Sequence, residues 1–333
     1  MAVRIQLPPV FNKGKIVKRY FIALLIPALL SGSASVLAQD DLVSAAFQGV
    51  AEIGKQWNGE VNAKTQALYT PLHQAVDSEG LVLHGDISYG PHPLQNFDLW
   101  VSDAGFREGG PVLIYFHGGG LTGGDKVSAE TNNLIYSNIG KWVARMGGIG
   151  INANYRLAPE VKFPAGAEDL RMIIEWVQEN IADYGGNPDN VFLMGNSAGA
   201  THVASYLYHE ASQLPEGPGI VAAILSSCGC GGGSAAYYGD DAAMRAATSP
   251  LALAQSYAGT QVPVYLWSAE YDPAFIESSV ADMYATLCHK YDDCPMYTQW
   301  QGYNHVSHVM SIDTADTTIT NGLVRFYHDM IGD

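Results

Sequence analysis

The sequence predicts an α/β protein with a mostly parallel, doubly wound sheet flanked by helices. Short and almost continuous apolar runs recur at residues 112–116 and 191–194, as expected for strands that are covered on both faces. Between them lies an amphipathic stretch, residues 165–182, in which Leu170, Ile173 and Val177 fall at helical spacing. Regular alternation of strands with helices favours a parallel sheet with helices on both sides.

The elements keep this alternation to the end of the chain. Residues 40–74 carry apolar side chains at mixed three- and four-residue spacing, which predicts a helix. The other predicted strands cover residues 81–84, 97–101, 148–153, 220–225, 262–267 and 296–300, and the other predicted helices cover about 131–146, 198–210, 241–257, 275–291 and 317–330. No repeat, charge block or linker divides residues 75–333, so we expect residues 39–333 to form a single domain.

Residues 1–38 have the three parts of a secretory signal peptide. A cationic lead ends at Arg19, an apolar run covers residues 20–30, and small residues lead up to Ala38, after which cleavage is predicted. Cleavage after Ala34 is the second choice, and an uncleaved anchor helix is the alternative. We therefore expect a secreted or periplasmic protein with no stable membrane anchor after cleavage.

The charge balance excludes some classes of partner. The chain has 333 residues, with 17 Lys and Arg against 33 Asp and Glu, and a formal charge of −16. The charged residues among residues 1–38 are all basic, so removal of this segment makes the mature chain more acidic still. This charge argues against binding to nucleic acid or to an anionic membrane surface. Nothing in the sequence indicates an oligomeric state.

Four cysteines follow the predicted signal peptide, and export would place them in an oxidising compartment. Cys288 and Cys294 are separated by five residues and form the favoured disulfide pair. A bond between Cys228 and Cys230, two residues apart, is expected to be strained. The sequence leaves all three pairings open, and no accompanying Cys-x2-Cys pair or suitably spaced histidine suggests a metal site.

The sharpest local signal is the segment Gly195-Asn196-Ser197-Ala198-Gly199, between a predicted strand and a predicted helix. A nucleophilic serine on a tight strand-to-helix turn needs neighbours with little side chain, and the glycines meet this need. The helix that follows directs its N-terminal amides towards developing negative charge. The segment therefore predicts Ser197 as a nucleophile and the amide of Ala198 as part of an oxyanion hole.

A second glycine motif strengthens this interpretation. His117-Gly118-Gly119-Gly120 directly follows the predicted strand at residues 112–116. Unshielded backbone amides of this kind can hold an oxyanion. A phosphate-binding loop is the alternative, but the sequence that follows has neither Gly-Lys-Ser/Thr nor a G-x-G-x-x-G pattern.

A serine nucleophile needs a base and an acid that orients it. On such a sheet the expected chain order is serine, then carboxylate, then histidine. Asp272 follows the predicted strand 262–267, with Glu270 as its rival, and His305 follows the strand 296–300, with His308 as its rival.

Several segments together carry a family resemblance, and they occur in the following order: His117-Gly118-Gly119-Gly120, Asn154-Tyr155-Arg156-Leu157-Ala158-Pro159-Glu160, Phe163-Pro164-Ala165, Glu168-Asp169, Gly195-Asn196-Ser197-Ala198-Gly199 and Asp272-Pro273. Over roughly residues 80–325 the chain resembles the hormone-sensitive-lipase-like carboxylesterases of the α/β-hydrolase superfamily. Two departures stand out. Asn196 occupies a position that is usually acidic in that group, and the segment after His305 lacks the usual small residue and phenylalanine.

The resemblance implies an α/β-hydrolase fold with a small helical cap. It implies Ser197 as nucleophile, His305 as base and Asp272 as orienting acid. The implied oxyanion donors are Gly119, Gly120 and Ala198, and no cofactor or metal is needed. The candidate cap segments are residues 39–75 and 229–261, whose candidate pocket residues are Phe47, Trp57, Tyr69, Tyr237, Tyr238 and Met244.

The expected function is a secreted serine carboxylesterase that acts on small-molecule esters with short to medium acyl chains. A lipase, an aryl or feruloyl esterase and a peptidase are alternatives on the same fold. A hydrolase-like binding protein without activity is an alternative of another class, and it is disfavoured because all three catalytic candidates are present.

Overall fold

The computed structural model describes residues 28–105 and 110–332, with side chains described from residue 38. The chain divides into two compact units, residues 1–38 and residues 39–333. Residues 1–27 of the predicted signal peptide lie outside the described residues, and the predicted cleavage position falls within a helix, α1 (Ala28–Ile53). In the part of the chain that the structure describes, no helix is both long and apolar enough to cross a membrane.

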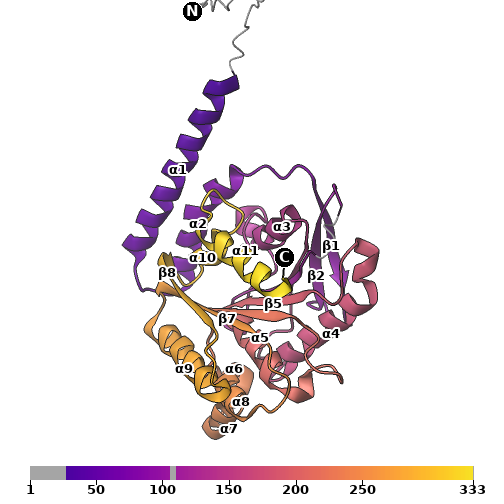
Figure 1. Cartoon of the computed structure of the whole chain (residues 1–333). Helices are drawn as coiled ribbons and strands as arrows, with labels where there is room; N and C mark the ends of the chain where they lie inside the picture. The colour runs from indigo at the N-terminus through magenta and orange to yellow at the C-terminus, as the bar shows by residue number, and fades with distance from the viewer. Residues whose placement is uncertain (1–27, 106–109, 333) are drawn as a thin grey trace, which may run out of the picture. The chain divides into compact units, whose positions relative to one another are not determined.

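The second unit is built on an eight-stranded sheet with the order β1-β2-β4-β3-β5-β6-β7-β8 (Figure 1). The strands are β1 (Leu81–Ser88), β2 (Asn96–Ser102), β3 (Val112–Phe116), β4 (Ile149–Ala153), β5 (Val191–Asn196), β6 (Ala222–Ser226), β7 (Val264–Tyr271) and β8 (Met296–Asn304). Strand β2 pairs antiparallel with both β1 and β4, and all pairs from β4 to β8 are parallel. The predicted mostly parallel sheet is confirmed.

Helices cover both faces of this sheet (Figure 1). Besides α1, the described α-helices are α2 (Gly59–Gln74), α3 (Ser137–Arg145), α4 (Ala165–Asn180), α5 (Ala198–Tyr208), α6 (Ala235–Tyr238), α7 (Ala242–Ala247), α8 (Pro250–Ser256), α9 (Ala274–Tyr291), α10 (Ser307–Met310) and α11 (Thr318–Ile331). Residues from α4, α5, α8 and α9 pack in one core, and residues from α1, α2, α3, α10 and α11 pack in the other.

Strand β3 shows why the strands are apolar throughout. Val112, Ile114 and Phe116 belong to one core, whereas Leu113 and Tyr115 belong to the other. Successive side chains of a strand point to opposite faces, so a strand between two helical layers needs an apolar residue at every position.

Three predicted helices are wrong in their extent. The segment predicted as one helix over 40–74 is divided between α1 and α2, because Gly54 has a φ of 64° and the side chain of Asn58 caps the amide of Val61. The predicted helix 241–257 is two helices, since Ser249 caps α8 and Pro250 stands in its first turn. Helix α3 begins only at Ser137, after residues with positive φ.

Each of the two disulfides joins cysteines that lie close together in the sequence. The favoured pair Cys288–Cys294 is present and joins the end of α9 to the segment before β8. Cys228 and Cys230, whose bond was expected to be strained, are also bonded, and their Cα atoms lie 5.3 Å apart, within the usual range for disulfides.

Candidate active site

Ser197 lies on a sharp turn between β5 and α5. Its φ is 54°, a conformation that side-chain-bearing residues rarely adopt. The turn is possible because Gly195 and Gly199 approach each other so closely that a Cβ on Gly195 would lie 2.3 Å from the carbonyl carbon of Gly199. The amide of Ser197 donates to the carbonyl of Ser226 at 2.9 Å, which ties the turn to the end of β6.

The other two predicted residues follow the ends of neighbouring parallel strands. Asp272 comes directly after β7, and His305 comes directly after β8. Both strands run further than predicted from the sequence. The carboxyl ends of parallel strands meet at one edge of a sheet, and this brings Asp272 and His305 beside Ser197.

The three side chains form a continuous hydrogen-bonded row. His305 Nε2 lies 2.8 Å from Ser197 Oγ, and His305 Nδ1 lies 2.7 Å from Asp272 Oδ1. An ionised carboxylate can only accept hydrogen bonds. His305 therefore donates a hydrogen bond from Nδ1–H to Asp272, and its Nε2 is free to accept a hydrogen bond from the serine hydroxyl. Both Asp272 and His305 are buried.

The carboxylate of Asp272 is held in its ionised form. Burial alone would raise its pKa, but the hydrogen bond and charge of His305, with the amide of Ala269, outweigh burial and lower the pKa. Its second oxygen accepts from Ser227 Oγ at 2.8 Å and from the Ala269 amide at 2.7 Å. The rival Glu270, on β7, instead accepts from the amide of Gly302 on β8, so it ties these two strands together near their carboxyl ends.

His308 points away from the serine. It is fully buried, its Nε2 bonds Ser226 Oγ and its Nδ1 lies 3.0 Å from the Asn304 carbonyl. Burial lowers the pKa of His308 to about 4. Asn196 Nδ2 lies 3.4 Å from His308 Nε2 and donates to the carbonyl of His305 at 3.2 Å, so the asparagine at the usually acidic position links the turn to the histidine segment.

The glycine loop after β3 also borders the serine. His117 bonds the carbonyl of Gly118 through Nδ1 at 2.6 Å and stacks on Tyr155, whose hydroxyl donates to the His117 carbonyl. These contacts of His117 hold the glycine loop in place. The amides of Gly119, Gly120 and Ala198 have no hydrogen-bond acceptor among the described residues, and all three residues line the cavity that contains Ser197.

That cavity has a volume of about 960 Å³, at the upper end of the usual range for small-molecule sites. The predicted cap segments both contribute to its wall. Trp57, Asn58 and Asn62 come from residues 39–75, and Gly231 and Tyr238 come from residues 229–261. Trp57 also meets the His305 ring edge-to-face, with ring centroids 4.5 Å apart.

Of the six aromatic and apolar cap candidates, only Trp57 and Tyr238 line the cavity. Phe47 packs against Tyr303, Tyr69 lies in the core, and Met244 is more than half exposed. Tyr237 is fully buried and accepts from the amide of Gly166. An apolar side chain in a cap segment therefore did not by itself identify a pocket residue.

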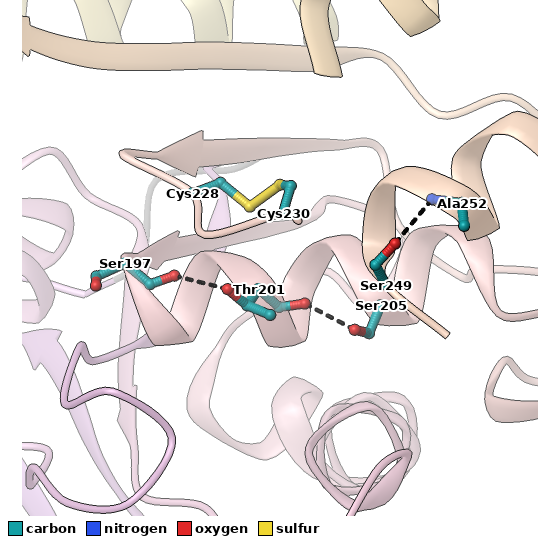
Figure 2. The surroundings of a disulfide bond; sticks show 7 residues. All are labelled: Ser197, Thr201, Ser205, Cys228, Cys230, Ser249 and Ala252. Carbon is teal, nitrogen blue, oxygen red and sulfur yellow. Dashed lines mark hydrogen bonds between the residues drawn. A yellow bond between two sulfur atoms is a disulfide. The ribbon is translucent and has the colours of Figure 1, made fainter. Parts of the chain in front are cut away.

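The Cys228–Cys230 bond lies beside the helix that follows the serine (Figure 2). Thr201 on α5 donates through its hydroxyl to the carbonyl of Ser197 at 3.2 Å. The carbonyl of Cys230 accepts from the amide of Leu251 at 3.0 Å, which ties the disulfide loop to α8. Ser227, the hydrogen-bond partner of Asp272, directly precedes this loop, and no sequence pattern indicated that contact.

The described residues contain no group of three or more His, Cys, Asp and Glu side chains placed to hold a metal ion. Ser197 is surrounded by an imidazole, a carboxylate and backbone amides without acceptors, the kinds of group that nucleophilic serine sites use.

Comparison with known families gives an identification that matches this geometry. The model of the Abhydrolase_3 family, described as the alpha/beta hydrolase fold, matches residues 113–305, which is more than half of the chain. The chain belongs to this family. The matched range runs from the strand before the glycine loop to His305, and the family resemblance inferred from the sequence motifs is confirmed.

Curated proteins of similar sequence match over part of their length. A chlorogenic acid esterase from Aspergillus niger is 40% identical over 128 residues, covering 36% of this chain and 23% of the relative. The esterase LipQ from Mycobacterium tuberculosis is 36% identical over 140 residues, covering 41% of this chain and 32% of the relative. The matches thus span about a quarter to a third of these relatives.

Solved structures share the alpha/beta hydrolase fold over nearly the whole chain. Esterase B from Lactobacillus Rhamnosis has a TM-score of 0.65 at 15% identity and covers 89% of this chain and 97% of its own. An arylesterase structure has a TM-score of 0.59 at 18% identity and covers 83% and 92% of the two chains. At these identities the likeness concerns the fold.

Proposed function

We propose that this protein is a serine carboxylesterase that hydrolyses small carboxylic esters through an acyl-enzyme. The observation that carries the proposal is the row of Ser197, His305 and Asp272, with 2.8 Å and 2.7 Å between the bonded atoms. Family membership and the esterase names of the partial relatives support the same reaction class.

In the first half-reaction, His305 Nε2 takes the proton of Ser197 as Oγ attacks the ester carbonyl carbon. The carbonyl oxygen becomes negative and accepts hydrogen bonds from the amides of Gly119, Gly120 and Ala198. The carbon–oxygen bond to the alcohol then breaks, and the protonated His305 gives its proton to the leaving alkoxide. The products are the alcohol and an ester of Ser197.

In the second half-reaction, His305 takes a proton from a water molecule that attacks the acyl carbon. The same amides hold the oxyanion, and the bond between the acyl carbon and Ser197 Oγ breaks. His305 returns the proton to the serine, and the acid leaves. Asp272 stays ionised throughout and stabilises the imidazolium that forms twice in each cycle.

Short to medium acyl chains suit the cavity. Its wall mixes apolar side chains such as Ile276 and Val306 with amides and hydroxyls such as Asn62 and Ser279. Long alkyl chains gain most from a continuous apolar channel, which this mixed wall does not offer among the described lining residues.

We also propose that the protein is exported, with residues 1–38 removed. The cationic and apolar pattern of these residues supports export, and two disulfides are typical of proteins from an oxidising compartment. An N-terminal Gln39 on the secreted protein would agree with this proposal, whereas an intact Met1 would contradict it.

The test of the catalytic proposal is hydrolysis of p-nitrophenyl butyrate by the wild type and by Ser197→Ala. We expect the substitution to lower kcat by at least about 10³-fold, since triad members act as a unit. Circular dichroism serves as the control for folding. Equal kcat values for the two folded proteins would reject the nucleophile.

A further inference from the structure

The charged side chains that line the cavity are all acidic, apart from the histidine of the reactive row. Asp125 and Glu130 stand in the wall, and no lysine or arginine is found among the described lining residues. Both carboxylates follow the glycine loop in the chain, and both residues are exposed. The charge facing a bound substrate on this side is therefore negative.

Neither carboxylate is neutralised by a cation. Asp125 Oδ1 accepts from the Asn154 side-chain amide at 3.2 Å, and Glu130 Oε2 accepts from the hydroxyl of Ser128 at 3.1 Å. These are neutral donors, which orient the carboxylates without cancelling their charge. No ion pair of either residue occurs within the described part of the chain.

Lys126, next to Asp125 in the chain, and Lys55, next but one to Trp57, are both paired elsewhere. Lys126 is buried, and its Nζ contacts Asp86 and lies 2.7 Å from Asp98 Oδ1. Lys55, in the segment before Trp57, binds Glu277 on α9 at 2.7 Å. Neither ammonium group lines the cavity, so a substrate carboxylate would find no cation partner in its wall.

We propose, on the basis of the ester hydrolase function proposed above, that this pocket selects esters by charge. Uncharged and cationic esters are accepted, and esters that carry a carboxylate are disfavoured. Asp125 and Glu130 are the specificity-determining residues. Since both side chains are exposed, their effect is screened by salt, and discrimination is greatest at low ionic strength.

The experiment compares esters of one chemical framework whose substituent is anionic, neutral or cationic. Phenyl butyrates carrying a meta carboxylate, its methyl ester or a trimethylammonium group differ in charge at the alcohol side. The p-nitrophenyl monoester of glutaric acid and its methyl ester place the same difference on the acyl side. Each kcat/KM is divided by the rate of hydroxide-catalysed hydrolysis, which removes differences in intrinsic reactivity.

For the wild type at low ionic strength we expect kcat/KM for the neutral member of at least one pair to exceed that of the anionic member by roughly tenfold. The ratio should fall towards one at about 0.5 M salt. Glu130→Gln should reduce it, and Glu130→Lys should reduce it further. Glu179→Gln, which removes an exposed carboxylate on α4 outside the cavity wall, should leave the ratio unchanged.

The possible failures are distinct. Ready hydrolysis of the neutral esters with ratios within about twofold of one in both pairs, or ratios that Glu130→Lys does not change, would overturn charge selection and leave the esterase proposal standing. Hydrolysis of none of the esters above the level of Ser197→Ala would overturn both.

Discussion

Two histidines, three residues apart at the end of β8, have opposite surroundings. His305 contacts the serine hydroxyl and an ionised carboxylate, whereas His308 is enclosed by Ser226, Asn196 and the Asn304 carbonyl. A histidine with its pKa lowered to about 4 by burial stays neutral near pH 7. With both ring nitrogens engaged away from the cavity, His308 is suited to hold the loop that presents His305.

Substitution of each histidine by glutamine separates these roles. We expect His305→Gln to lower kcat/KM for p-nitrophenyl butyrate by at least about 10³-fold, because no base remains. His308→Gln should stay within about tenfold of the wild type, since an amide side chain can replace the buried hydrogen bonds. The reverse order of the two variants would move the base to His308.

The three residues of the row could be predicted from the sequence because each follows an apolar strand in the order that this fold requires. The choice between Asp272 and Glu270 needed the structure. Strand β7 extends to Tyr271 and so includes Glu270, and Asp272 is the first carboxylate after the strand and the one that contacts the histidine. Ser227 could not have been predicted as a partner of Asp272, because its contact depends on the path of the loop after β6.

Among the structural elements, the two short disulfide loops differ in their position relative to the cavity. Cys288–Cys294 joins α9 to the segment before β8, and neither cysteine lines the cavity. Cys228–Cys230 closes a loop whose Gly229 lines the cavity. The two flanking residues also belong to the site, since Gly231 lines the cavity and Ser227 bonds Asp272. The first bond is therefore expected to act on stability alone, and the second on stability and activity.

Paired substitutions test this difference. Loss of the Cys288–Cys294 bond by alanine substitution of both residues should lower the free energy of unfolding by about 2 kcal/mol, as the loop-length relation gives for so small a loop, with kcat/KM unchanged. Alanine substitution of Cys228 and Cys230 should lower kcat/KM roughly tenfold, the effect of one weakened hydrogen bond at the reactive row. Denaturant titration and ester kinetics measure both quantities. Equal kcat/KM values for the two double variants would contradict the assignment.

The elements themselves were largely predictable, and the errors concern their ends. Apolar strands between two layers of helices leave a clear sequence pattern, as in β3 and β5. The divisions at Gly54 and at Ser249-Pro250 depend on one or two residues that outweigh helical periodicity over a longer window. These divisions matter for the site, because the first of them places Trp57 against His305.

For the whole molecule, buried neutral histidines determine the response to acid. Burial lowers the pKa of His73 and His308 to about 4 and that of His202 to about 3. An unfolded histidine titrates near pH 6.5, so below that pH the unfolded state binds more protons than the folded state. These three histidines therefore lower the free energy of unfolding as the pH falls from about 6.5 to about 4.

His202 offers the clearest test, because both of its ring nitrogens are buried without a hydrogen-bond partner in the described structure. We expect His202→Leu to flatten the slope of unfolding free energy against pH in this range by up to about 1.4 kcal/mol per pH unit. Asp313, whose pKa burial raises to about 6, acts in the opposite direction but equally in both proteins. His328→Gln, at an exposed position, is the control. An unchanged slope in His202→Leu would contradict this account.

Covalent labelling tests most directly whether Ser197 Oγ is the atom that becomes acylated. The wild type is treated with a fluorophosphonate, and the modified residue is identified by peptide mass spectrometry. We predict one adduct, on the peptide that contains Ser197, and none in Ser197→Ala. An adduct on another serine, or ester hydrolysis by a protein that forms no adduct, would contradict the claim.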